Sequence, residues 1–284
     1  MVAVLMGFVL WRNVPAVPVE SPGVAVKAAQ QSASSDARAD GALTHTTKRG
    51  SAESARVAAF EELKRRAKAG DAVAQRLLAD TYDACFFVNL DREAFIKGLD
   101  FNRTTMSDPT HLPFLEQMAT ERLAKCGAVE GGAIVPMQII RGWYAQAAEN
   151  GDLAARLTDN ALSQRKVEAA EAAQLLEDVL DSNDPAAVFA MGSTLVNNYT
   201  LTPGDPAEGL MTGELASTAW QVAACRMGYE CEPTGVIMGN LCLLQNACAG
   251  EDYEGYLMRE LRSDAQRELL QRRVSEILRL VQGQ

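Results

Sequence analysis

The chain has 284 residues, of which 48% are hydrophobic, 6% aromatic and 23% charged, and its formal net charge is −10. This length allows one substantial domain with a tail, and few aromatic residues beside abundant alanine disfavour a sheet. Residues 1–50 carry five basic and three acidic side chains, a net charge of +2, so residues 51–284 carry −12. A domain this acidic is poorly suited to nucleic acid, and we expect no such partner.

The first twelve residues contain an apolar run, Val2–Trp11, with no charged side chain, followed by Arg12. The run is too short to cross a bilayer, which takes about 20 residues, and a signal peptide would carry positive charge ahead of it. We interpret residues 1–12 as the end of an N-terminal anchor or signal sequence that starts upstream of Met1. Contact with a membrane is expected through this segment alone. A short segment packed on the domain is the alternative.

Residues 13–50 are predicted to form a disordered linker. Pro15, Pro18 and Pro22 stiffen its start, and an Ala/Ser/Gln-rich stretch without apolar periodicity follows. His45 lies in this linker, where a catalytic geometry could not be held.

The helical domain is expected to span residues 51–284, and its clearest feature is a helical hairpin around Gly70-Asp71. Gly70 suits the left-handed residue after a helix end, and Asp71 suits the N-cap of the next helix. Apolar side chains recur at helical spacing on both sides of this turn: Val57, Phe60, Leu63 and Ala67 before it, and Ala74, Leu77, Leu78, Tyr82 and Cys85 after it. Two amphipathic helices joined by so short a link must pack antiparallel.

Further helices are predicted along the rest of the chain, and no alternating apolar run indicates a strand. Their expected ranges are a short helix at Asp91–Leu99, then Pro113–Lys125, 134–150, 152–163, 165–181 and 234–248. Asp184-Pro185 supplies an N-cap followed by proline, a strong start signal. Asp205-Pro206 has the same signature with Glu208 added, ahead of an apolar helix through Trp220 that ends near Gly228, and Ser263 caps a last helix.

The turn at Gly70-Asp71 carries the pattern A-x-x-G-D-A-x-A-Q with a tyrosine further on, and it resembles the Sel1-like branch of the tetratricopeptide-type repeats. The likeness continues around two later turns: at Trp143, Ala147, Ala148, Gly151, Asp152 and Ala155, and at Asp184, Ala187, Phe189 and Met191. It implies an all-α, irregular stack of antiparallel helical hairpins.

The spacing of the turns departs from this family. Asp152 lies 81 residues after Asp71, and Asp184 follows after 32, whereas family repeats keep a regular period of about 35 residues. An irregular helical domain with one familiar hairpin is the alternative.

The six cysteines are Cys85, Cys126, Cys225, Cys231, Cys242 and Cys248, and the last four follow the scheme C-x5-C-x10-C-x5-C. Zinc sites favour closer C-x2–4-C pairs, which are absent from the sequence, and buried free thiols are a further alternative. We favour disulfides in an oxidising compartment, in agreement with the apolar N-terminus. The preferred pairs are Cys225 with Cys231, Cys242 with Cys248 and Cys85 with Cys126. A nested pairing, Cys225 with Cys248 and Cys231 with Cys242, is the rival.

The sequence contains no motif for catalysis, phosphate binding or a metal, and no catalytic, cofactor or metal residues are assigned. His111 precedes Pro113 in a predicted loop, without a motif for a Ser-His or Cys-His mechanism. Glu116 and Glu121 share a predicted helix, but a spacing of five does not put them on one face. The basic run Lys64, Arg65, Arg66 and Lys68 is interpreted as a solvated helix end, where the dipole favours cations.

The first functional hypothesis is a non-enzymatic adaptor or scaffold of the periplasm or cell envelope, anchored by its N-terminus. Sel1-like proteins are often adaptors, and the acidic surface favours a basic protein partner. The alternative is an envelope hydrolase that acts on cell-wall glycan through a catalytic glutamate, which requires a buried glutamate with a raised pKa.

Overall fold

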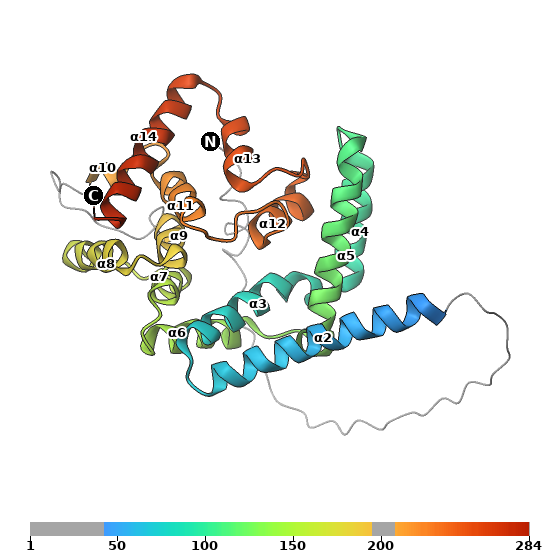
Figure 1. The fold of residues 1–284 in the computed structure, drawn as a ribbon. Helices are drawn as coiled ribbons and strands as arrows, with labels where there is room; N and C mark the ends of the chain where they lie inside the picture. The colour runs from blue at the N-terminus through green and yellow to red at the C-terminus, as the bar shows by residue number, and fades with distance from the viewer. Residues whose placement is uncertain (1–42, 195–207, 284) are drawn as a thin grey trace, which may run out of the picture. The chain divides into compact units, whose positions relative to one another are not determined.

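A computed structural model describes residues 43–194 and 208–283 of the chain (Figure 1). The regular elements in these ranges are α-helices and two short 3-10 helices. The first nine elements are α2 (Leu43–Lys68), α3 (Ala72–Leu90), α4 (Arg92–Thr105), η1 (Pro109–His111), α5 (Leu112–Ala128), η2 (Val129–Gly132), α6 (Met137–Glu149), α7 (Leu153–Leu162) and α8 (Ala169–Ser182). The remaining elements are α9 (Pro185–Thr194), α10 (Glu208–Met211), α11 (Ala216–Arg226), α12 (Val236–Gln245), α13 (Tyr253–Glu260) and α14 (Asp264–Val281). The all-α prediction is confirmed for this part of the chain.

The contacts divide the chain into two compact units, residues 1–43 and 44–284, and the fold described below belongs to the second. The apolar run Val2–Trp11, most of the predicted linker and the predicted helix start at Asp205-Pro206 lie outside the described residues.

The predicted hairpin around Gly70-Asp71 is present and joins α2 to α3. Gly70 has a φ of +91°, in the left-handed region. The Asp71 carboxylate accepts the backbone N–H of Ala74 at 3.0 Å and so caps α3. The buried Gln75 donates from Nε2 to the Ala67 carbonyl at 3.0 Å, which ties the two helices together across the turn.

The turn between α6 and α7 repeats the backbone and capping hydrogen bonds of this turn. The Asp152 N–H donates to the Ala147 carbonyl at 2.9 Å, as the Asp71 N–H donates to the Arg66 carbonyl at 3.2 Å. The Asp152 side chain accepts the Ala155 N–H at 2.7 Å. The predicted turn at Asp184 is also present, with the left-handed residue Asn183 in the place of glycine.

Helix α2 begins at Leu43, inside the stretch predicted to be linker, so residues 43–50 are helical. Every residue from Ser51 to Ala59 is exposed, and Phe60 is the first buried apolar residue. Residues 51–59 therefore bury no apolar face, which explains why the sequence signal for this part of the helix was weak.

The region between residues 86 and 112 is more regular than the sequence predicted. Helix α3 runs to Leu90 and α4 extends to Thr105, where a short helix ending at Leu99 was expected. Asp91 separates the two helices: its N–H donates to the Phe87 carbonyl at 3.5 Å, and its side chain accepts the Ala94 N–H at 2.8 Å. One residue therefore ends α3 and caps α4.

The apolar helix predicted through Trp220 begins later than expected, because the chain breaks between α10 and α11. Gly213 and Leu215 have φ values of +84° and +62°. Arg273 of α14 donates to the carbonyls of Gly209 and Thr212 at 2.6 and 3.1 Å. This guanidinium supplies the hydrogen bonds that a continuous helix would have provided.

The core consists of three clusters of buried apolar side chains. The largest lies among α7–α9 and α11–α14 and contains the fully buried Trp220, whose indole N–H donates to the Leu210 carbonyl at 3.1 Å. The second joins α2, α3 and α6 around Leu78 and Tyr82, and the third joins α4, α5 and α12. Helices α9 and α11 meet closely at Gly192, where a Cβ would lie 2.6 Å from the Ser217 carbonyl oxygen.

Three disulfides link all six cysteines. Cys85 pairs with Cys126 between α3 and α5, Cys225 with Cys231 after α11, and Cys242 with Cys248 after α12. These are the pairs that the sequence favoured over the nested arrangement. Three disulfides indicate an oxidising, extracytoplasmic environment.

Among the described helices, none alone is both long and apolar enough to cross a membrane. One pair, Pro109–Gly132 with Met137–Glu149, passes on length and composition together but is bent by 92°.

Candidate functional site

The strongest concentration of perturbed charged groups surrounds one face of α3. Arg76, Asp80 and Asp83 follow each other at spacings of four and three residues, which places them on the same side of that helix. Three other elements contribute to this set, which we call the α3 charged cluster: Arg76, Asp80 and Asp83 of α3, Lys125 of α5, Tyr144 of α6, and Tyr229 and Glu230 after α11.

Arg76, the first residue of the cluster, forms an ion pair with Asp152, the residue that caps α7. Its Nε lies 3.0 and 2.9 Å from the two Asp152 carboxylate oxygens. The Arg76 side chain is 12% exposed and that of Asp152 is 2% exposed. Asp80 is a more distant partner, 3.5 Å from Arg76 Nη1. The positive charge of Arg76 therefore neutralises Asp152 more fully than it neutralises Asp80.

Asp80 is held by the hydroxyl of Tyr144, which donates to Asp80 Oδ1 at 2.7 Å. Burial raises the pKa of Asp80, and the hydrogen bond from Tyr144 and the charge of Arg76 oppose this effect. Burial also raises the pKa of Tyr144, with the charges of Asp80 and Asp83 adding to it. The Asp80 side chain nevertheless keeps 44% of its surface exposed. It is therefore a carboxylate with much of its hydration removed that solvent can still reach.

Asp83 is the least compensated group of the cluster. Although Asp83 is exposed, the helices around it remove part of its hydration, which raises its pKa to about 6, and the neighbouring negative charge of Asp80 contributes to the shift. No described residue donates a hydrogen bond to Asp83 or forms an ion pair with it. A carboxyl group with this pKa is largely ionised at neutral pH and lacks a counter-charge.

The far side of the cluster is formed by α5 and the segment after α11. Burial and the charge of Arg122 lower the pKa of Lys125, while Glu230 and Asp80 act in the opposite direction. Burial and the charge of Asp80 raise the pKa of Tyr229 to about 12. The Tyr229 ring is stacked on Phe189 with the ring centroids 4.3 Å apart. Tyr144 therefore contacts Asp80 directly, and Tyr229 lies within electrostatic reach of it.

The glutamates considered in the sequence do not form a catalytic pair. Glu116 receives two hydrogen bonds from Arg103, at 2.5 and 2.9 Å, and this partner lowers its pKa. Glu121 is exposed and accepts from Gln117 at 3.0 Å. No glutamate within residues 50–194 and 209–283 is buried. Every resolved pKa shift of a glutamate is downward: Glu62, Glu116, Glu130, Glu171 and Glu254.

The histidine and the basic run also lack catalytic partners. His111 ends η1, with Nε2 3.7 Å from Asp108 Oδ2, and every cysteine is in a disulfide. In the basic run, Arg65 pairs with Glu62 at 2.6 Å, and Lys64 pairs with Glu130 at 2.5 Å. No group of three or more His, Cys, Asp or Glu within the described ranges could hold a metal ion.

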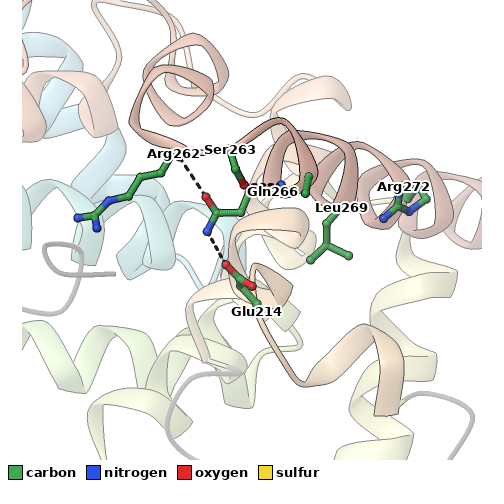
Figure 2. Close-up of a pocket in the computed structure, with 7 residues that line it drawn as sticks. Glu214, Arg262, Ser263, Gln266, Leu269 and Arg272 are labelled. Carbon is green, nitrogen blue, oxygen red and sulfur yellow. Dashed lines mark hydrogen bonds between the residues drawn. The ribbon is translucent and has the colours of Figure 1, made fainter.

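A second candidate is a surface pocket of about 500 Å³ beside the first turn of α14 (Figure 2). Figure 2 shows the Gln266 side chain at its centre, donating to Glu214 Oε1 at 2.6 Å and accepting the Arg262 N–H at 3.0 Å. Ser263 caps the helix by accepting the Gln266 N–H at 3.2 Å. The pocket's polar groups mostly bond with one another. The α3 charged cluster contains carboxylates that are not fully neutralised, and it is therefore the stronger candidate site.

Sequence reasoning missed the α3 charged cluster, although one signal for it was present. Arg76, Asp80 and Asp83 form a charged stripe on an otherwise apolar helix. The stripe does not reveal Tyr144, which is 64 residues from Asp80 in the chain. The perturbed pKa values depend on those distant partners.

Comparisons with protein-family models, curated proteins and solved structures found no match. The part of the chain that the structure describes is thus all-helical, with about 13 helices, three disulfides and a charged cluster on α3.

Proposed function

We propose that this chain is a non-enzymatic interaction protein of the cell envelope that binds a basic segment of a protein partner at the α3 charged cluster. The observation that carries the proposal is the pair Asp83 and Asp80: Asp83 is an exposed carboxylate without a counter-charge, and Asp80, 44% exposed, is incompletely neutralised by Arg76. A lysine or arginine side chain from a partner would supply the missing positive charge. Its binding would lower the pKa of both carboxyl groups.

The surroundings of these carboxylates support a cationic ligand. Tyr229 is partly exposed and lies within electrostatic reach of Asp80, and aromatic rings attract cations, arginine in particular, through their π faces. Tyr144 is buried and holds Asp80 through its hydroxyl. Residues 51–284 carry a net charge of −12, which would accelerate association with a basic partner and make it sensitive to salt.

The proposal includes descent of the two Gly-Asp hairpins from Sel1-like repeats. Their matching turn hydrogen bonds support this relation. Polar contacts between the hairpins also support it: Asn150 donates to Gln75 Oε1 at 2.8 Å, and Arg76 binds Asp152. Stacked hairpins of this kind present adjacent helix faces to a partner.

Periplasmic localisation is the remaining part of the proposal, with residues 1–12 as the anchor or signal. The three disulfides support it. Free thiols should be blocked in intact cells of the native host, and the protein should then be weighed by mass spectrometry. We expect no blocked thiol. Six blocked thiols would instead place the protein in a reducing compartment.

Partner binding is tested with the full-length oxidised chain immobilised and exposed to an envelope extract. We expect a basic protein that is retained by the wild type, released by high salt and not retained by Asp80→Asn/Asp83→Asn. The control is Glu93→Gln, which also removes a negative charge, from an exposed pair with Lys97, and which should retain the partner. Retention by the double variant, or no specific capture by the wild type, would refute the assignment to α3. Release of reducing ends from cell-wall glycan by the purified chain would refute the non-enzymatic role.

A further inference from the structure

We propose that the Cys225–Cys231 disulfide is a redox latch. In this proposal a dithiol reductant opens it while the other two disulfides stay closed, which frees the segment carrying Tyr229 and Glu230. The selective reduction of this disulfide does not depend on the proposed function. Its effect on partner binding does rest on that function.

Accessibility distinguishes this disulfide from the other two. Cys225 is partly exposed at the end of α11, whereas its partner Cys231 is buried, at 6% exposure. The remaining cysteines are buried: Cys85 and Cys248 are 1% exposed, and Cys126 and Cys242 are 0% exposed. A thiolate must reach a disulfide sulfur to attack it. Attack on a buried disulfide therefore requires local unfolding first.

The matched spacing of the two short disulfides isolates burial as the difference between them. Cys225–Cys231 and Cys242–Cys248 both join residues six positions apart. Cys242 and Cys248 both lie in the third core cluster with Leu115 and Met118, whereas in the other pair Cys231 is a buried member of the largest core cluster and Cys225 is only partly buried against it. The length of the closed loop therefore cannot explain a difference in reducibility between them.

The Cys225–Cys231 loop positions Tyr229 for the α3 charged cluster. The Tyr229 N–H donates to the Ala224 carbonyl at 3.0 Å, and the Cys231 N–H donates to the Tyr229 carbonyl at 2.7 Å. The Cys231 carbonyl accepts the Tyr253 N–H at 3.0 Å, at the start of α13. Apart from the disulfide, the segment is held by these backbone bonds, by the stacking of Tyr229 on Phe189, by the packing of Met227 and Cys231 in the largest core cluster, and by the Arg226–Glu254 ion pair at its start.

The exchange reaction proceeds in two steps. A thiolate of the dithiol attacks the Cys225 sulfur, the S–S bond breaks, and Cys231 leaves as a thiolate that takes up a proton. The second thiol of the reductant then attacks the mixed disulfide and displaces Cys225 as a thiolate, which is protonated in turn. The reductant ends as a disulfide, and two electrons and two protons have reached the protein.

The first experiment treats the full-length oxidised chain with increasing dithiothreitol, followed by alkylation and mass spectrometry of peptides. We expect Cys225 and Cys231 to be alkylated together at a dithiothreitol concentration at least about tenfold below that needed for the other four cysteines. Equal or earlier alkylation of Cys242 and Cys248 would overturn the proposal.

The conformational part is tested by trypsin cleavage after Arg226, which is exposed and paired with Glu254 at 2.5 Å. We expect faster cleavage once Cys225–Cys231 is reduced, and fast cleavage in Cys225→Ser/Cys231→Ser under oxidising conditions. The matched control, Cys242→Ser/Cys248→Ser, should leave cleavage after Arg226 slow. Unchanged cleavage in the selectively reduced wild type would overturn the latch, and this measurement does not depend on any variant folding.

Loss of partner capture on selective reduction would link the latch to the α3 charged cluster. Capture that survives reduction but is lost in Asp80→Asn/Asp83→Asn would refute the coupling and leave the proposed function intact. Capture that survives both changes would refute the proposed function.

Discussion

Asp152 and Asp71 cap their helices in the same way, yet alanine at Asp152 should destabilise the fold far more. Both carboxylates accept a backbone N–H three residues ahead, at 2.7 Å from Ala155 and 3.0 Å from Ala74. The difference lies in their arginine partners. Arg66, beside Asp71, keeps 47% of its side chain exposed, whereas Arg76, beside Asp152, keeps 12%.

The magnitude follows from two contributions at Asp152. Loss of an N-cap side chain costs about 1 kcal/mol. A buried charge that loses its partner costs about 3–5 kcal/mol, and the lower end applies because Asp80 remains 3.5 Å from Arg76. We therefore expect Asp152→Ala to lower the free energy of unfolding by about 4 kcal/mol. Asp71→Ala should lose little beyond its cap, because exposed ion pairs contribute little.

The assay is urea unfolding of the full-length oxidised chain, followed by far-UV circular dichroism. Asp152→Asn should fall between the wild type and Asp152→Ala, because an asparagine side chain still caps α7 but carries no charge. Arg76→Met in the Asp152→Ala background should recover part of the loss by removing the unpaired charge. If the free energies of unfolding of Asp152→Ala and Asp71→Ala differ by less than about 1 kcal/mol, the buried Arg76–Asp152 pair does not stabilise the fold as argued.

Three further predictions concern packing, pH and a disulfide. Gly192→Ala should lower the free energy of unfolding by about 1–3 kcal/mol, because its Cβ would lie 2.6 Å from the Ser217 carbonyl oxygen and 2.9 Å from Trp220 Cβ. Gly127→Ala, in α5 with no atom within 4 Å of the new Cβ, is the control and should not destabilise; equal losses would disprove the steric cause. Because the pKa of Asp83 rises from 3.8 to about 6 on folding, the folded state binds more protons in that range, and stability should fall as the pH rises from about 4 to about 6. Asp83→Asn should raise the urea midpoint at neutral pH and weaken this pH dependence, and a lower midpoint would contradict the partial desolvation of this exposed carboxylate. Cys85→Ala/Cys126→Ala should lower the free energy of unfolding by about 4 kcal/mol in the chain-entropy model, given their sequence separation of 41; a loss below about 1 kcal/mol in the urea assay would exclude that contribution.

Most features predicted correctly from the sequence are those that neighbouring residues determine; the Cys85–Cys126 pair, 41 residues apart, followed because these were the two cysteines left over. Gly70 and Asp71 determine their turn by themselves, because Gly70 adopts the left-handed conformation and Asp71 caps the next helix. The Cys225–Cys231 and Cys242–Cys248 pairs could be predicted because each joins residues six positions apart. Short-range signals of this kind need no knowledge of the tertiary structure.

The features that the sequence did not reveal depend on residues far apart in the chain. The break before α11 is stabilised by Arg273, which is 61 residues from Thr212. The α3 charged cluster requires α5, α6 and the segment after α11 to meet beside Asp80. The start of α2 was missed for a different reason, since residues 51–59 bury no apolar face to mark it.

Arg76 links the stability of the fold to the proposed binding site, because it lies between two carboxylates. Asp152 holds the guanidinium at 2.9 Å, and Asp80 lies 3.5 Å away on the other side. While Asp152 takes most of the positive charge, Asp80 remains available to a cationic partner. Without Asp152, Arg76 would pair with Asp80 and compete with that partner. Asp152→Ala should therefore weaken partner capture as well as the fold, although Asp152, being 2% exposed, is too buried to contact the partner itself.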